Sequence, residues 1–158
     1  MTTAINYNKN SDEQAINGLL ERLSKTFSSL SAMTDDEIKS AYREMYTEDC
    51  DYVLFDGTRL KGVEANAETH IQLGRMWIFK GAALEGISSE ITFLSDTVAI
   101  AHTTGAIRFR WQKKVPKGRL SVQTTVFIKQ NGMWKIRAFQ NTRIQPPTIF
   151  QKLFSSKK

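Results

Sequence analysis

Two polar residues on otherwise apolar strands could do chemistry in this sequence. His102 shares an alternating face with Val98 and Ile100, and Gln140 continues the alternation that begins at Trp134. Desolvation disfavours a charged imidazole, so a neutral His102 could act as a base or a hydrogen-bond donor, with Gln140 orienting a ligand. The alternatives are a core histidine with protein partners and a glutamine bonded to water or backbone near the rim of the sheet.

Aromatic side chains could form the walls of a pocket around this pair. Tyr42 and Tyr46 fall one helical turn apart, and Tyr52 follows on a predicted strand. Their hydroxyls could polarise a carbonyl group, or their rings could belong to the apolar core. Trp77 is a further candidate for the pocket wall or the core.

The second histidine, His70, stands at the margin of a helical apolar stripe. It could face the pocket from the helical side, opposite His102, or lie exposed at the boundary of that stripe. No acidic residue follows Asp96, which leaves His102 as the best candidate base. Two histidines without a carboxylate at matching spacing do not make a zinc site, so we expect no metal. The sequence holds no glycine-rich dinucleotide motif and no paired cysteine, so we also expect no cofactor.

Helices come first in the chain. Ser11 with Gln14, and Thr34 with Glu37, have the spacing of capping boxes that begin helices. A third helical pattern runs over residues 62–78, after a short hairpin that turns at 56–57. Alternating patterns then predict four long strands over residues 84–94, 97–111, 120–130 and 133–144.

The register of the last hairpin decides which side chains face the core. A two-residue turn at Asn131-Gly132 is one possibility, and a three-residue loop with a bulge at Gly132 is the other. We prefer the loop with the bulge because it gathers Val126 and other apolar residues on the face of Trp134. In both registers Gln140 and Thr142 face the core, and Thr142 therefore joins the candidate pocket.

Helices followed by a meander of long strands predict an α+β domain. About three N-terminal helices would pack on a strongly curved antiparallel sheet and form a cone whose open end is a pocket. We expect a flexible N-terminus over residues 1–10, one domain over 11–145 and a C-terminal tail over 146–158.

Four segments, taken in order, resemble the nuclear transport factor 2-like superfamily, whose fold is called cystatin-like. They are YTEDCDY at 46–52, LKGVEA at 60–65, VAIAH at 98–102 and GMWKIRAFQNTR at 132–143, the last being similar to the SgcJ/EcaC group near SnoaL-like proteins. The resemblance implies the fold, and a function among isomerases, dehydratases, hydrolases, cyclases or proteins that only bind or assemble. A small, mostly apolar molecule is the expected ligand, and a non-catalytic homodimeric module the alternative.

Charge is divided unevenly along the chain and bears on the choice of partner. Residues 1–96 hold all 16 acidic residues and 9 basic ones, whereas residues 97–158 hold 13 basic residues and no acid. The basic half could hold a polyanion, but its charges are spread along strands beside acidic helices, so we do not expect nucleic acid. We expect a homodimer formed through the outer sheet face, where Lys135, Arg137 and Phe139 would alternate.

The compartment is inferred from what the sequence lacks. No apolar run is long enough to span a bilayer, so we expect no membrane partner. The polar N-terminus does not resemble a secretory signal. Cys50 is the single cysteine and suits a reducing compartment. These features favour the cytoplasm.

Overall fold

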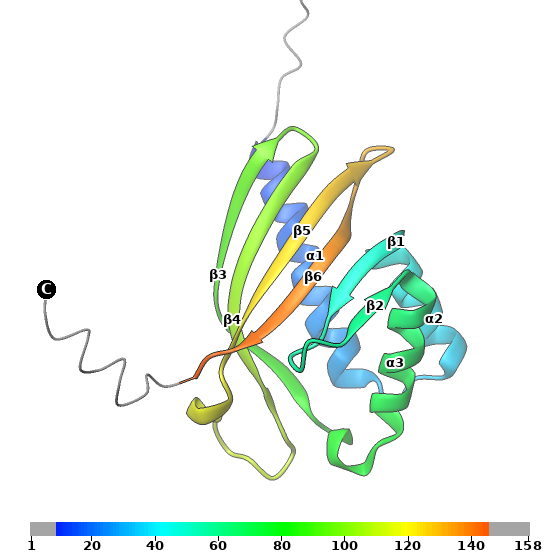
Figure 1. The fold of residues 1–158 in the computed structure, drawn as a ribbon, viewed down its shortest axis with the longest axis vertical. Coiled ribbons are helices and arrows are strands. Elements are labelled where there is room, and N and C mark those ends of the chain that lie inside the picture. The colour runs from blue at the N-terminus through cyan, green and yellow to red at the C-terminus, as the bar shows by residue number, and fades with distance from the viewer. Residues whose placement is uncertain (1–8, 146–158) are drawn as a thin grey trace, which may run out of the picture.

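Helices occupy the first half of the chain and long strands the second half (Figure 1). The computed structural model describes residues 9–145, so that most of segment 1–10 and all of segment 146–158 lie outside the described residues. The helices are α1 (Lys9–Ser29), α2 (Asp35–Met45), α3 (Val63–Arg75) and the short 3-10 helices η1 (Trp77–Phe79) and η2 (Lys117–Arg119). The strands are β1 (Tyr46–Val53), β2 (Arg59–Lys61), β3 (Ala83–Ser95), β4 (Val98–Arg108), β5 (Ser121–Gln130) and β6 (Met133–Arg143).

Local sequence signals account for several element ends. Thr34 and Glu37 form the predicted capping box: the Glu37 backbone N–H donates to the Thr34 hydroxyl at 3.3 Å, and the Thr34 N–H donates to the Glu37 carboxylate at 2.8 Å. Gly62 precedes α3 with a φ of +83°, a conformation that L side chains rarely adopt. The chain therefore turns sharply from β2 into the helix that carries His70.

The sheet has six strands in the order β2-β1-β6-β5-β4-β3 (Figure 1). The four long strands, β3 to β6, form the predicted antiparallel meander. The short hairpin of β1 and β2 joins this meander through a parallel pairing of β1 with β6, which the sequence did not predict. With three helices packed on this sheet, the chain has the expected α+β cystatin-like architecture.

A bulge in β6 changes which of its side chains face the core. The hairpin uses the two-residue turn, with Gln130 paired to Met133, so the preferred three-residue loop was wrong. Further along, Phe127 pairs with Ile136 but Val126 pairs with Ala138, which leaves Arg137 as an extra residue. An extra residue shifts a period-two pattern by one, so the residues after Arg137 face the sheet side opposite to the one expected.

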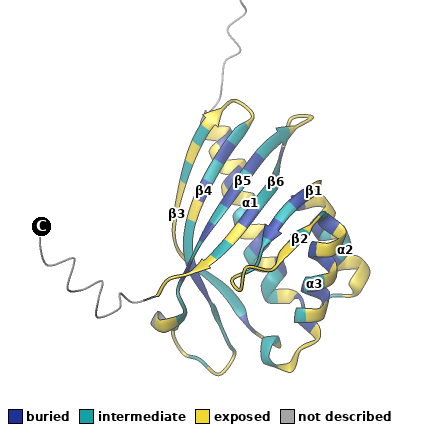
Figure 2. Ribbon diagram, in the orientation of Figure 1, coloured by how far each residue is buried: buried dark blue, intermediate teal, exposed yellow. Residues whose placement is uncertain are grey.

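The core lies between the helices and the concave face of the sheet. Helix α1 crosses that face beside β3 and β6, and α2 and α3 pack together next to β1. Buried positions gather where these elements meet (Figure 2). Trp134 and Ile136 are buried as their alternation predicted, as are Ile16, Tyr42 and Phe127. None of the described helices is long and apolar enough to cross a membrane.

Candidate pocket between the helices and the sheet

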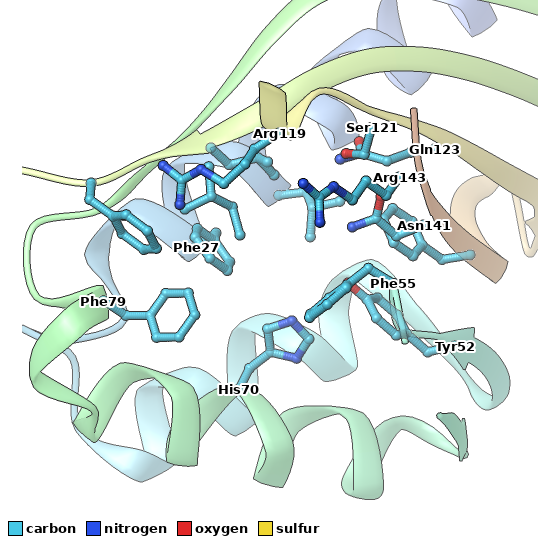
Figure 3. Close-up of a pocket in the computed structure, with 15 residues that line it drawn as sticks. Phe27, Tyr52, Phe55, His70, Phe79, Arg119, Ser121, Gln123, Asn141 and Arg143 are labelled. Carbon is cyan, nitrogen blue, oxygen red and sulfur yellow. The ribbon is translucent and has the colours of Figure 1, made fainter. Parts of the chain in front are cut away.

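A cavity of about 240 Å³ opens between α1, α3 and the inner face of the sheet (Figure 3). Apolar side chains make up most of its wall: Leu23, Phe27, Tyr52, Phe55, Phe79, Leu84, Ile107, Phe109 and Phe139. Polar side chains complete it: His70, Arg119, Ser121, Gln123, Asn141 and Arg143. Such a lining, mostly apolar with a few convergent polar groups, is typical of small-molecule sites.

His70 points into this cavity from α3 (Figure 3). Its Nδ1 atom lies 2.9 Å from the backbone oxygen of Asn66, one turn earlier. Because a carbonyl only accepts, Nδ1 carries the proton and Nε2 is left as a hydrogen-bond acceptor. The ring is 3% exposed, and burial lowers the pKa of His70 to about 4. His70 is therefore neutral at physiological pH.

Tyrosine rings hold His70 in place. The ring centroid of Tyr52 lies 5.3 Å from that of His70, edge to face, and Tyr42 lies 5.0 Å away behind it. Tyr52 lines the cavity, whereas Tyr42 and Tyr46 stack on each other in the core and are not among the lining residues. Burial raises the pKa of all three phenols, so they remain neutral.

The opposite wall is polar and cationic. Arg119 from η2 lies over the Phe109 ring, 4.4 Å from its centroid, and Arg143 ends β6. Figure 3 shows both guanidinium groups on the sheet side of the cavity, across from His70. Among the residues that line the cavity there is no carboxylate. The Oδ1 atom of Asn141 is buried and accepts no hydrogen bond from a described residue. The two guanidinium groups favour a ligand with a negative or carbonyl oxygen, whereas Asn141 Oδ1 can accept a hydrogen bond from a donor on the ligand.

His102 and Gln140 do not face this cavity, contrary to the prediction. Both are exposed on the outer face of the sheet, where Thr124 on β5 pairs with His102 on one side and Gln140 on the other. Gln140 and Thr142 were misplaced because the Arg137 bulge reverses the facing of β6 beyond it. His102 was misplaced because its face of β4, although rich in β-branched residues, is not covered by any described helix.

Trp77 was also expected in the pocket and lies outside it. It follows the end of α3, is 75% exposed, and stacks on Trp111 with ring centroids 6.2 Å apart. Phe139 was expected on the outer face, but it is 4% exposed and stacks on Tyr52 inside the cavity. The same bulge turns Phe139, Asn141 and Arg143 inward.

Sequence reasoning therefore found Tyr52 and His70 among the lining residues and missed the polar wall. Asn141 and Arg143 could have been found only by locating the bulge, for which the sequence has no glycine or proline marker near Arg137. Gln123 was missed because the preferred register placed the alternate residues of β5, such as Val126, on the core face. In the observed register Gln123 lies on that face instead.

Neither a metal site nor a reactive thiol accompanies the cavity in the part of the chain that the structure describes. No group of three or more histidine, cysteine or acidic side chains gathers within residues 9–145. Burial raises the pKa of the Cys50 thiol to about 11, which makes it a poor nucleophile. The chemistry of the cavity thus rests on imidazole, guanidinium, amide and hydroxyl groups.

Comparison with solved structures shows the fold. No protein-family profile and no curated protein matches the sequence. A domain of unknown function with a cystatin-like fold from Nostoc punctiforme is similar with a TM-score of 0.74 and 23% identity, over 94% of this chain and 86% of that one. A nuclear transport factor 2-like protein with a cystatin-like fold from Novosphingobium aromaticivorans gives a TM-score of 0.71 at 16% identity, over 90% and 88% of the two chains.

A third similar structure carries the name of an enzyme. It is a protein of Novosphingobium aromaticivorans named as a candidate scytalone dehydratase, with a TM-score of 0.68 and 18% identity over 85% of each chain. These likenesses confirm the cystatin-like fold that the resemblance to nuclear transport factor 2-like proteins predicted. A fold of this kind carries many functions, so the function must be argued from the cavity itself.

Proposed function

We propose that this protein binds a small, flat, mostly apolar molecule with an acidic or carbonyl oxygen, and that His70 exchanges a proton with it. The observation that carries the proposal is the neutral His70 ring, which faces an aromatic cavity whose far wall holds two arginines and no carboxylate. Planar apolar ligands match the aromatic walls. An oxygen that is negative, or becomes negative, matches Arg119 and Arg143.

The arrangement supports proton transfer next to a carbonyl group. His70 Nε2 would accept a proton from the carbon beside the carbonyl, while the Asn66 oxygen keeps Nδ1–H in place. The negative charge that develops on the ligand oxygen would be stabilised by the arginines on the sheet side. The same proton returned to another carbon gives an isomerase. Returned to a hydroxyl group on the neighbouring carbon, which then leaves as water while the C=C bond forms, it gives a dehydratase and restores neutral His70. The name of the similar protein from Novosphingobium aromaticivorans agrees with the dehydratase form.

The low pKa of His70 is compatible with this role. In the empty cavity burial keeps the ring neutral and ready to accept a proton. A ligand anion beside it favours the imidazolium, and so raises the His70 pKa toward the range in which general bases work. Proton uptake by His70 and charge on the ligand thus support each other.

Binding is tested by calorimetry with 2-naphthoate and its neutral analogue 2-naphthamide. We expect the carboxylate to bind more tightly, because only the carboxylate pairs with Arg119 and Arg143. In the double variant Arg119→Gln/Arg143→Gln the preference should disappear while the neutral amide still binds. Equal affinity for both compounds in the wild type would contradict the charge complementarity on which the proposal depends.

Assembly into a dimer is a second proposal, supported by a different observation. The outer face of the sheet carries a row of apolar side chains, with Ile100, Val126 and Ala138 paired side by side on β4, β5 and β6. No described helix covers that face. A second copy of the chain would bury it, as the predicted homodimer requires.

A further inference from the structure

Several exposed apolar side chains lie in or next to the segments that line the cavity. Phe55, Met76, Trp77 and Trp111, here called the mouth patch, are each between 49% and 75% exposed. Trp111 lies between Trp77 and Phe109, with ring centroids 6.2 Å and 5.0 Å apart, and Phe109 lines the cavity. The mouth patch is therefore continuous with the apolar wall inside.

Cations without acidic partners flank the mouth patch. Arg110, Lys113 and Lys114 are exposed on the loop between β4 and η2, and Lys80 follows η1. None of them forms an ion pair with a residue in the described range 9–145, whereas nine other ion pairs are present there. No acidic residue occurs from 97 to 158. Asp56 is exposed beside Phe55, so these four cations outnumber the acid that adjoins the mouth patch in sequence, and its edge carries net positive charge.

We propose that this end of the molecule docks on a membrane surface that contains anionic lipids. Tryptophan and phenylalanine side chains insert at the boundary between headgroups and acyl chains, while lysine and arginine pair with anionic headgroups. The mouth patch matches the apolar boundary of the acyl chains, and the flanking cations match the anionic headgroups. The expected lack of a membrane partner depended on the absence of a spanning segment, which surface docking does not require.

Docking in this orientation would have a consequence for ligand entry. Phe55 of the mouth patch lines the cavity, and Trp111 stacks on Phe109 in its wall, so docking through the mouth patch would bring this side of the cavity against the bilayer. A flat apolar molecule partitions into lipid and could then enter the cavity without crossing water. This consequence depends on the proposed function, but docking itself does not, so the variant His70→Asn should bind vesicles as the wild type does.

Vesicle sedimentation of the full chain tests the proposal. We expect binding to vesicles of equal parts phosphatidylcholine and phosphatidylglycerol, and much weaker binding to phosphatidylcholine alone. Lys113→Gln/Lys114→Gln should weaken binding about 25-fold, since each cation near an anionic surface contributes about fivefold. Trp77→Ala/Trp111→Ala should weaken it by roughly tenfold through loss of the inserted rings.

The matched control is Leu94→Ala/Met133→Ala. These side chains are 61% and 62% exposed, but they lie beside the turns at the opposite end of the sheet (Figure 1). The control should bind vesicles like the wild type. In the wild type, tryptophan emission should shift to the blue on vesicle addition, and this shift should vanish in Trp77→Ala/Trp111→Ala. The proposal would be overturned if the wild type did not sediment with anionic vesicles, or if the control variant lost as much vesicle binding as the test variants. Tighter binding to single-stranded RNA than to vesicles would also overturn it.

Discussion

The Nδ1 atom of His70 donates to the backbone oxygen of Asn66 at 2.9 Å within α3, while the same ring faces the cavity with Nε2. His70 therefore contacts the backbone of α3, the buried tyrosine rings and the cavity at the same time. The His70 side chain is buried away from solvent. The residues that line the cavity include no carboxylate that could pair with it. A neutral histidine in that position has measurable consequences for stability before any ligand is known.

Stability should depend on pH through His70. The folded-state pKa of about 4 lies below the unfolded value of 6.5, so the unfolded chain binds more protons between these values. The contribution is fully present above pH 6.5 and is lost as pH falls toward 4, by about 3 kcal/mol in all. Urea melts at several pH values should show this slope in the wild type. In His70→Gln the total loss of stability between pH 6.5 and 4 should be smaller by that amount; an equal loss in both proteins would contradict the buried neutral ring.

Trp134 should be a major contributor to stability. Its ring is 5% exposed, and its Nε1–H donates to Asp12 at 2.7 Å, which ties the last hairpin to α1. Trp134→Ala should lower the free energy of unfolding by about 3–5 kcal/mol, because it opens a cavity and removes a partner of a buried carboxylate. Trp77→Ala, at an exposed ring, should change it by less than about 0.5 kcal/mol. Denaturant melts of the two variants make the comparison.

A charged residue in the apolar row of the outer face should break the proposed dimer. Val126→Lys places an ammonium group between Ile100 and Ala138 on neighbouring strands. Sedimentation equilibrium should give a dimer for the wild type and a monomer for this variant at micromolar concentration. Glu13→Lys, on the exposed face of α1, should remain dimeric. A monomeric wild type would remove the proposal of assembly.

Much of the fold was predictable because local signals agreed with one another. The capping box at Thr34 and the alternation through Trp134 and Ile136 each depend on neighbouring residues only. The parallel pairing of β1 with β6 was not predictable in this way, since it joins segments about ninety residues apart. Long-range pairing of this kind leaves no short-range pattern in either strand.

The candidate site was less predictable than the fold, and one residue explains much of the difference. The bulge at Arg137 exchanges the two faces of β6, so Gln140 lies outside and Asn141 inside. Period-two reasoning assigns every later residue of the strand to the wrong side once a single residue is added. His70 was named as a pocket candidate, with an exposed position as the alternative, because the regular apolar stripe of α3 places it at the margin of the buried side.

The bulge itself should be essential for the cavity. Deleting Arg137 would restore strict alternation, turn Phe139 and Asn141 outward and bring Gln140 into the aromatic wall. We expect a loss of several kcal/mol in stability, as for other disrupted cores, together with loss of 2-naphthoate binding. Arg137→Ala keeps the extra residue and should retain the binding of 2-naphthoate. If the deletion variant bound that probe like the wild type, the assignment of the polar wall would be wrong.

The most direct measurement is an NMR titration of the His70 imidazole in the free protein and in the protein saturated with 2-naphthoate. We predict that His70 titrates near pH 4 in the free protein and at a clearly higher pH when the carboxylate is bound. A His70 that titrates near 6.5 in the free protein, or whose pKa does not move on saturation, would contradict a proton-exchanging histidine in a ligand pocket.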